Sequence, residues 1–212
     1  MIRKDIQNKI NLSKLLQKFI LAVILIMIVH PLNATYYSNV KTFSKDNLLQ
    51  MVVEIPAGTN KKIEYDEGLN SFLIDKRDGV GRIVNFLPYP GNYGFIPSTK
   101  MDKKRGGDGD ALDILLISES IDTGTIVDVI PIGLLVLKDS NEIDTKIIAI
   151  PAEKSLRIIN AANYSDLDKD YLILKDMIKL WFISYKGKGL IEFIKWGDEI
   201  DAKAEINKWA LK

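Results

Sequence analysis

The chain has 212 residues, no cysteine and a single histidine, His30. A Cys/His zinc site, a cysteine nucleophile and a Ser-His-Asp triad all need side chains that residues 35–212 lack. Any catalysis by that part of the chain must therefore use Asp, Glu, Lys, Arg and Tyr side chains. Internal repeats and low-complexity segments are also absent from it.

An excess of charge of one sign is lacking too, since 29 basic and 28 acidic residues give a formal net charge of +1. The balance is uneven along the chain. Residues 1–34 hold five basic side chains and one acidic one, which leaves 24 basic and 27 acidic side chains in residues 35–212. A mildly acidic segment is a poor nucleic-acid binder, so we expect no nucleic-acid partner. Its length suits one domain with a substantial core, so we expect residues 35–212 to form a single domain.

The N-terminal segment contains an uninterrupted apolar run at residues 19–29, after a basic stretch and before Pro31. This pattern is typical of a secretory signal, because eleven apolar residues fall short of the roughly 20 that span a bilayer. We expect residues 1–34 to be a signal peptide, or a membrane anchor if they are not removed. The protein would then be exported or periplasmic, and the alternative is a cytoplasmic protein.

Short apolar runs separated by Gly, Pro, Asp and Asn predict many short strands. They lie at residues 51–55, 62–65, 72–74, 82–87, 114–117, 126–130, 132–137 and 146–150. From about residue 174 the apolar residues recur at helical spacing, which predicts two principal C-terminal helices, at about 174–185 and 199–211. This order indicates an α+β fold, with an OB-fold-like closed β-barrel core and both helices packed against it.

An acidic cluster stands directly before the apolar run 114–117. Asp108, Asp110 and Asp113 lie within six residues, and the glycines among them let neighbouring acids converge. Carboxylate oxygens are the ligands that Mg²⁺ and Mn²⁺ prefer. The cluster predicts a site for a hard divalent cation, and a solvated turn or a structural Ca²⁺ loop are the alternatives.

A charged pair marks the predicted strand 62–65. Lys62 and Glu64 share one face, because side chains alternate along a strand, while Ile63 and Tyr65 point the opposite way. The charged pair can line a site while the apolar pair enters the core. A solvated strand face is the alternative for these two residues taken alone.

Several motifs, in the same order, resemble those of the family I soluble inorganic pyrophosphatases over roughly residues 48–212. They are VEIP at 53–56, KIEY at 62–65, Arg82 followed by NYG at 92–94, DGDALD at 108–113, DSNEIDTK at 139–146 and YK at 185–186. Ala111 departs from the family pattern, which usually has proline there.

The resemblance implies Mg²⁺-dependent hydrolysis of inorganic pyrophosphate to two phosphates by a metal-activated water. It implies several Mg²⁺ ions per site, with Mn²⁺ as a substitute, and a homo-oligomer. The implied catalytic residues are Asp110 as the base, Tyr93 and Arg82. The implied metal ligands are Glu54, Asp108, Asp110, Asp113, Asp139 and Asp144. The implied substrate contacts are Lys62, Glu64, Arg82, Tyr93, Lys146, Tyr185 and Lys186. Lys76 and Arg77 are alternatives to Arg82 as the phosphate-binding cation.

Two other functions stay open on the sequence alone. One is hydrolysis of another exported phosphoanhydride, since the sequence does not discriminate among leaving groups. The other is a non-catalytic OB-fold-like module that binds metal or nucleic acid. The acidic charge of residues 35–212 argues against nucleic acid as the ligand of such a module.

Overall fold

The structure, a computed structural model, describes residues 35–140 and 142–211. The predicted signal or anchor segment, residues 1–34, lies outside the described residues. From Tyr36 onward the chain forms one compact unit. Within the described part, none of the helices has the length and apolar character needed to cross a membrane.

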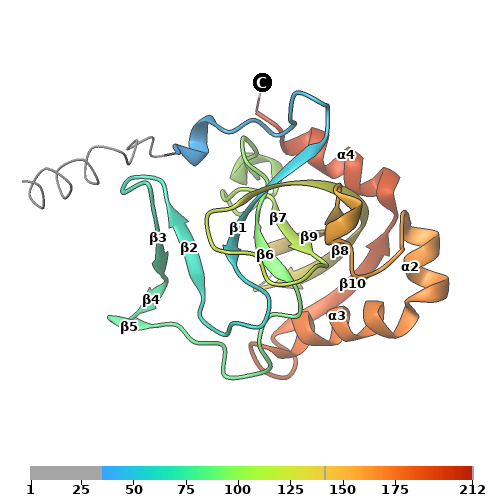
Figure 1. Cartoon of the computed structure of the whole chain (residues 1–212). Coiled ribbons are helices and arrows are strands. Elements are labelled where there is room, and N and C mark those ends of the chain that lie inside the picture. Colours follow the sequence, from blue (N-terminus) through green and yellow to red (C-terminus); the bar gives the residue numbers. More distant parts are fainter. Residues whose placement is uncertain (1–34, 141, 212) are drawn as a thin grey trace, which may run out of the picture. The chain divides into compact units, whose positions relative to one another are not determined.

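A mixed sheet of six strands forms the centre of this unit (Figure 1). The strand order is β1-β6-β7-β9-β8-β10, and β1 also pairs with β8. Because β1 is hydrogen-bonded to both β6 and β8, five strands close into a barrel and β10 extends beyond β8. The strands are β1 (Leu49–Ile55), β6 (Asn92–Phe95), β7 (Asp113–Leu116), β8 (Ile126–Asp139), β9 (Glu142–Pro151) and β10 (Ile191–Gly197). The predicted α+β fold with a closed barrel core is confirmed.

Two small sheets lie beside the barrel strands (Figure 1). They pair β2 (Ile63–Asp66) with β3 (Ser71–Ile74), and β4 (Lys76–Arg77) with β5 (Val80–Gly81). The predicted strand 82–87 is wrong, because only an isolated bridge from Ile83 to Lys61 forms there. Val84 alone of its apolar side chains is buried. An apolar run predicts a strand but does not show whether a neighbouring strand is available to pair with it.

The predicted strands 126–130 and 132–137 form one continuous strand, β8. Its register with β9 shifts between Pro131 and Gly133. Proline has no N–H to donate to the ladder, so a strand ordinarily tolerates it only at an edge or at such an irregularity. The shift lets the strand continue past Pro131. The apolar runs did not predict the barrel strand β6, the short strands β4 and β5, or β10.

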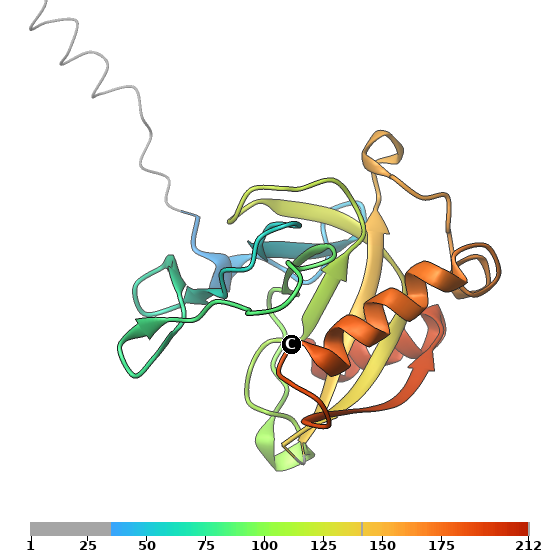
Figure 2. The same cartoon turned by 90° about the horizontal axis from the view of Figure 1, so that it is seen from below.

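Three α-helices occur in the described part of the chain: α2 (Tyr164–Asp170), α3 (Leu172–Ser184) and α4 (Glu199–Trp209). Single 3-10 turns are η1 (Tyr37–Asn39), η2 (Lys103–Arg105) and η3 (Lys154–Leu156). Helices α3 and α4 are the two that the sequence predicts, while the short α2 was not predicted. Seen from below, α3 lies across the near side of the barrel (Figure 2).

The barrel strands are buried on both faces, which explains their nearly continuous apolar runs. Ile114 and Leu116 of β7 belong to a core cluster that includes the buried side of α4. The alternate residues Leu115 and Ile117 belong to a second cluster with α3. Since Asp113 precedes Leu115 by two positions, its side chain lies on the α3 face of the strand.

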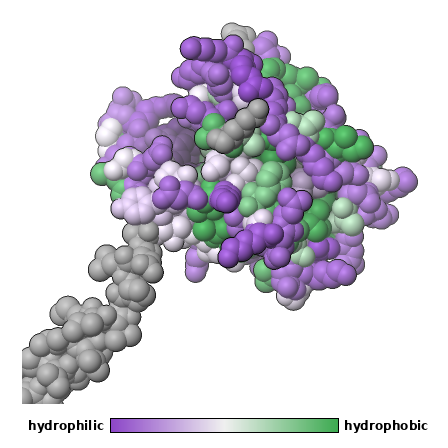
Figure 3. Space-filling model, turned by 90° about the horizontal axis from the view of Figure 1, so that it is seen from above, coloured by the Kyte–Doolittle hydropathy of each residue, from purple (hydrophilic) through white to green (hydrophobic). Residues whose placement is uncertain are grey.

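Some apolar side chains remain at the surface. Figure 3 shows hydrophobic residues in patches between hydrophilic ones on the face seen from above. On α3, Ile173, Met177 and Leu180 are 71%, 59% and 53% exposed and are spaced along one side of the helix. A contiguous exposed apolar surface is typical of a protein–protein contact. The homo-oligomer nevertheless stays a prediction.

Candidate active site

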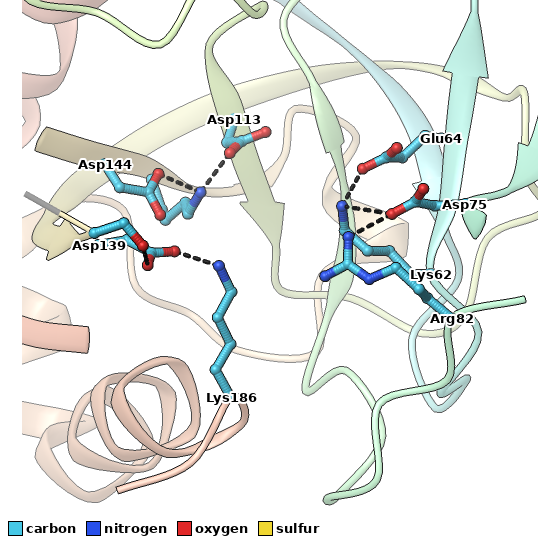
Figure 4. A network of polar contacts seen from close by, with 10 residues as sticks. Lys62, Glu64, Asp75, Arg82, Asp113, Asp139, Asp144 and Lys186 are labelled. Atoms are coloured by element: carbon cyan, nitrogen blue, oxygen red, sulfur yellow. Dashed lines mark hydrogen bonds and ion pairs between the residues drawn. The ribbon is translucent and has the colours of Figure 1, made fainter. Parts of the chain in front are cut away.

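Lys146 of β9 joins two carboxylates (Figure 4). It lies opposite Asp113 of the parallel strand β7, and its ammonium group forms ion pairs with Asp113 and with Asp144. The residue is only 6% exposed. Burial alone would lower the pKa of Lys146, but the two carboxylates raise it above its usual value. Lys146 is therefore a fixed positive charge, and we call these three residues the Lys146 group.

A second group of charges forms where three backbone segments meet. The Asp75 N–H donates to Lys62 O at 2.8 Å, Arg82 N–H to Asp75 O at 2.7 Å, and Lys62 N–H to Arg82 O at 3.1 Å. The side chain of Lys62 pairs with Glu64 and, at 3.4 Å, with Asp75, while Arg82 also pairs with Asp75. We call these four residues the Lys62 group (Figure 4).

Asp75, which pairs with both cations of the Lys62 group, was not among the predicted site residues. Burial raises the pKa of Asp75, but Arg82 and Lys62 lower it overall. An acid after the apolar run 72–74 was the only signal in the sequence. Lys76 and Arg77 are exposed on β4, so the structure brings Arg82 rather than either of them to Lys62.

The C-terminal half contributes a third contact. Asp139 at the end of β8 pairs with Lys186, which follows α3 (Figure 4). Burial raises the pKa of Asp139, yet the hydrogen bond and charge of Lys186 lower it overall. Burial also raises the pKa of the neighbouring Tyr185 to about 12. The Tyr185 hydroxyl therefore stays protonated at neutral pH and can act as a donor.

The loop that carries Asp108 and Asp110, which we call the acidic loop, contains a hydrogen bond between these two residues. Asp108 Oδ1 accepts a hydrogen bond from Asp110 N–H at 2.9 Å. Burial, then the charges of Asp108, Asp113 and Glu64, raise the pKa of Asp110. Asp113 of the Lys146 group and Glu64, the partner of Lys62, are thus among the charges that raise the pKa of Asp110.

Glu54 of β1 is a half-buried carboxylate that forms no ion pair with any described residue. Its Oε1 accepts a hydrogen bond from Tyr65 N–H at 2.7 Å. Burial first, and then Asp113 and Glu64, raise the pKa of Glu54 to about 8, although the Tyr65 N–H lowers it. The charge of Lys62 also lowers the pKa of Glu54 but does not offset the effect of burial.

Tyr93 of β6 lies beside Lys146, whose Nζ is 5.6 Å from the centre of the Tyr93 ring. Burial, followed by Asp113 and Asp144, raises the pKa of Tyr93 well above its ordinary value. The Tyr93 hydroxyl therefore stays protonated at neutral pH and can donate a hydrogen bond.

Two aromatic residues near Tyr93 were not predicted as part of the site. Tyr89 is 4% exposed, and its ring centre lies 5.4 Å from that of Tyr93 and 4.6 Å from that of Trp181. Trp181 stacks on Tyr185 with ring centres 4.8 Å apart, and its Nε1–H donates to Leu87 O at 2.9 Å. These contacts connect helix α3 to the irregular segment that carries Arg82.

The predicted metal ligands are not preassembled around one point. Among residues 35–140 and 142–211, no three His, Cys, Asp or Glu side chains already form a group that could hold a metal ion. Asp113 and Asp144 are not free to form such a group, because the Lys146 ammonium group pairs with both of them. Ion pairs do join several predicted site residues, within the Lys62 group, within the Lys146 group and between Asp139 and Lys186.

The charge of the site nevertheless fits divalent cations. Eight carboxylates face four cations, which leaves a formal charge of about −4 by the ordinary charges of these side chains. The carboxylates are Glu54, Glu64, Asp75, Asp108, Asp110, Asp113, Asp139 and Asp144. The cations are Lys62, Arg82, Lys146 and Lys186. Burial first, and then neighbouring carboxylates, raise the pKa values of Glu54 and Asp110, and oxygen-rich anionic sites suit Mg²⁺.

Comparison with known proteins identifies the family. The sequence profile of the family described as inorganic pyrophosphatase matches residues 51–212. The inorganic pyrophosphatase of Aquifex pyrophilus is 35% identical over 167 residues, which are 76% of this chain and 86% of that protein. The one from Campylobacter jejuni is 33% identical over 171 residues, 80% and 92% of the two chains. A crystal structure of an inorganic pyrophosphatase from Neisseria gonorrhoeae matches with a TM-score of 0.68 and 31% identity, over 82% of this chain and 96% of that one. The chain belongs to the family I inorganic pyrophosphatases.

Proposed function

We propose that this inorganic diphosphatase binds pyrophosphate between the Lys146 group and the Lys62 group and uses Mg²⁺ as its resident metal. The observation that carries the proposal is the pairing of two cationic groups with an excess of carboxylates in one site. Burial raises the pKa of Tyr89, and the charges of both Lys146 and Arg82 lower it in part. Burial first, and then the charge of Asp113, raise the pKa of Glu54, and the charge of Lys62 lowers it in part. These shared influences support the proposal that both groups act on one small anion.

The side chains of this chain have distinct tasks in the reaction. Lys62, Arg82, Lys146 and Lys186 bind the phosphoryl oxygens, and arginine suits a bidentate grip on phosphate. Each of these cations is held by carboxylates before the substrate arrives, so substrate oxygens exchange with those partners. Tyr93 and Tyr185 donate from protonated hydroxyls, which positions the anion.

The six predicted ligands, Glu54, Asp108, Asp110, Asp113, Asp139 and Asp144, would hold Mg²⁺, with Mn²⁺ as a substitute. Divalent metal bound there lowers the pKa of water and offsets the negative charge of pyrophosphate. Asp110 accepts the proton of the attacking water, since its raised pKa makes it a stronger base than an ordinary aspartate. This assignment gives Asp110 a task that an amide cannot perform.

A phosphate-release assay tests the proposal. We expect Mg²⁺-dependent release of phosphate from pyrophosphate, and a loss of about 10²- to 10⁴-fold in kcat for Asp110→Asn. Asp170→Asn, at the exposed end of α2, is the matched control and should keep full activity. No phosphate release with Mg²⁺, or an Asp110→Asn variant as active as its parent, would contradict the proposal.

The choice of phosphate-binding arginine has its own test. We expect Arg82→Ala to raise KM for pyrophosphate at least tenfold, at a cost of about 1.4 kcal/mol in binding. Arg77→Ala, an exposed arginine five residues away, should leave KM unchanged. The reverse pattern would transfer the assignment to Arg77.

We also propose that residues 1–34 direct export, because a basic stretch precedes the apolar run 19–29. Cell fractionation with N-terminal sequencing of the mature chain tests this, and a chain that starts at Met1 in the cytoplasm would contradict it.

We propose a homo-oligomer on the exposed apolar stripe of α3. A monomer by light scattering would contradict that second proposal.

A further inference from the structure

A concavity lies beside the loop that carries Asp108 and Asp110. It has a volume of about 420 Å³ and is lined by two stretches of the chain, 100–109 and 208–211. Its cations are Lys100, Lys103, Arg105 and Lys208, and its acid is Asp102. Volumes of roughly 300–1,000 Å³ are typical of small-molecule sites. We call it the loop pocket.

Most of the positive charge in the loop pocket is not neutralised by the protein. Lys208 pairs with Glu205 at 3.2 Å. Lys100, Lys103 and Arg105 form no ion pair with any described residue. The Asp102 carboxylate accepts from the Lys104 N–H at 2.9 Å, as the N-cap of η2. Three cations are thus available to an anion.

Arg105 is held in place before any ligand binds. Its Nη1–H donates to Lys208 O at 3.0 Å, and its guanidinium carbon lies 4.8 Å from the centre of the Trp209 ring. Trp209 is itself 2% exposed, and its main-chain O accepts from Lys100 N–H at 2.9 Å. A guanidinium already fixed in position loses less entropy on binding an oxyanion, and its fork suits tetrahedral oxyanions such as phosphate.

The loop pocket and the acidic loop share one set of backbone hydrogen bonds. Gly109 N–H donates to Met101 O at 2.7 Å, and Met101 N–H donates to Asp110 O at 2.8 Å. Gly109 adopts φ +98°, and the Lys103 stem lies so close that a Cβ at Gly109 would be 2.6 Å from its Cε. Lys103 is also a cation whose charge acts on Asp110. A ligand that moves Lys103 therefore changes the charge beside Asp110.

We propose that the loop pocket binds a small phosphate-class anion through Lys100, Lys103 and Arg105, and that its binding tightens the hold of the acidic loop on Mg²⁺. The first part is independent of the catalytic site, whereas the second rests on the proposed metal site. We expect tighter rather than weaker Mg²⁺ binding, because an added anion that draws Lys103 toward it makes the electrostatic potential at the acidic loop more negative. Linkage requires Mg²⁺ to strengthen anion binding by the same factor.

Equilibrium dialysis of the full chain with radiolabelled sulfate tests the binding part, because sulfate is a tetrahedral dianion that is neither substrate nor product. We expect Arg105→Ala to lower sulfate affinity at least tenfold. Arg77→Ala, the exposed control, and Lys62→Ala, which damages the Lys62 group, should keep it. Equal binding by the parent and Arg105→Ala would overturn the proposal, as would a loss confined to Lys62→Ala. Binding to phosphatidylglycerol vesicles without any sulfate binding would overturn it in favour of a membrane surface.

Calorimetric titration with Mg²⁺ at constant ionic strength tests the coupling. With sulfate in place of chloride, we expect the Kd for Mg²⁺ to fall about 3- to 10-fold in the parent and to stay unchanged in Arg105→Ala. An unchanged Kd in the parent would overturn the coupling. Neither experiment needs turnover, so a chain that binds sulfate in the loop pocket but releases no phosphate from pyrophosphate contradicts the proposed function alone.

Discussion

Lys146 shows how strongly one residue depends on its neighbours. Its charge is buried, and Asp113 and Asp144 supply the compensation. Removing one partner of a buried ion pair leaves an uncompensated charge, which costs far more than the pair contributes as a whole. We therefore expect the same residue to be important for stability when no metal is bound.

We expect Lys146→Met to lower the free energy of unfolding by about 3 kcal/mol in EDTA, because Asp113 and Asp144 then repel each other. Mg²⁺ should reduce this deficit, since a cation between the two acids replaces the ammonium group. Urea unfolding with and without Mg²⁺ measures both values. Lys195→Met is the control: its side chain is 59% exposed and its pair with Asp201 spans 3.8 Å. Equal effects of the two substitutions would contradict the expectation.

Glu54 makes stability depend on pH. Its pKa is about 8 in the folded chain against an ordinary value of 4.5. Between these values the folded chain holds a proton that the unfolded chain has released, so this group's contribution falls as pH rises through the window.

Glu54→Gln removes that dependence. In EDTA, we expect the free energy of unfolding of the variant relative to that of its parent to increase by roughly 2–4 kcal/mol as the pH is raised from about 5 to about 9. The magnitude follows from about 1.36 kcal/mol per pKa unit. Urea unfolding at both pH values measures the gain. The exposed Glu67→Gln serves as the control. A difference between Glu54→Gln and the parent that does not change with pH would refute the expectation.

At the scale of elements, α3 positions the segment that carries Arg82 and Tyr89. The segment has no ladder of its own beyond the bridge at Ile83, so its place depends on contacts with other elements. The bond from Trp181 Nε1–H to Leu87 O is one of them, and it joins residues 94 positions apart.

Comparing substitutions at two tryptophans measures the contribution of this hydrogen bond. Trp181→Phe leaves Leu87 O without its donor, whereas Trp196→Phe removes an Nε1–H that is buried and has no partner among the described residues. We therefore expect Trp181→Phe to cost about 1–2 kcal/mol more in urea unfolding. It should also raise KM for pyrophosphate, while Trp196→Phe should not. Equal costs would show that the bond contributes nothing.

At the scale of the whole molecule, the excess of carboxylates links stability to metal. A ligand that binds only the folded chain stabilises it by about 2.7 kcal/mol at 100 times its Kd. We expect Mg²⁺ to raise Tm in a concentration-dependent manner and EDTA to reverse the rise. The double variant Glu54→Gln/Asp110→Asn should lose more than half of the shift, and Asp170→Asn should keep it. A full shift in the double variant would place the metal elsewhere.

The sequence alone determined those features that depend on local pattern. The alternation in Lys62-Ile63-Glu64-Tyr65 predicted that the two charges share a face, and they form an ion pair. The apolar runs predicted most barrel strands because both faces of these strands are buried. The order of the motifs was enough to indicate the family.

Only the tertiary structure decided which charges meet. Asp113 and Lys146 are 33 residues apart, and Asp139 and Lys186 are 47 apart. Asp75 joins the Lys62 group because three backbone segments converge there. The strand order that brings such residues together depends on hydrogen bonds between segments distant in the chain, and a local pattern does not record them. The motifs therefore indicated the chemistry, and the packing of distant segments against one another determined which cation neutralises which acid.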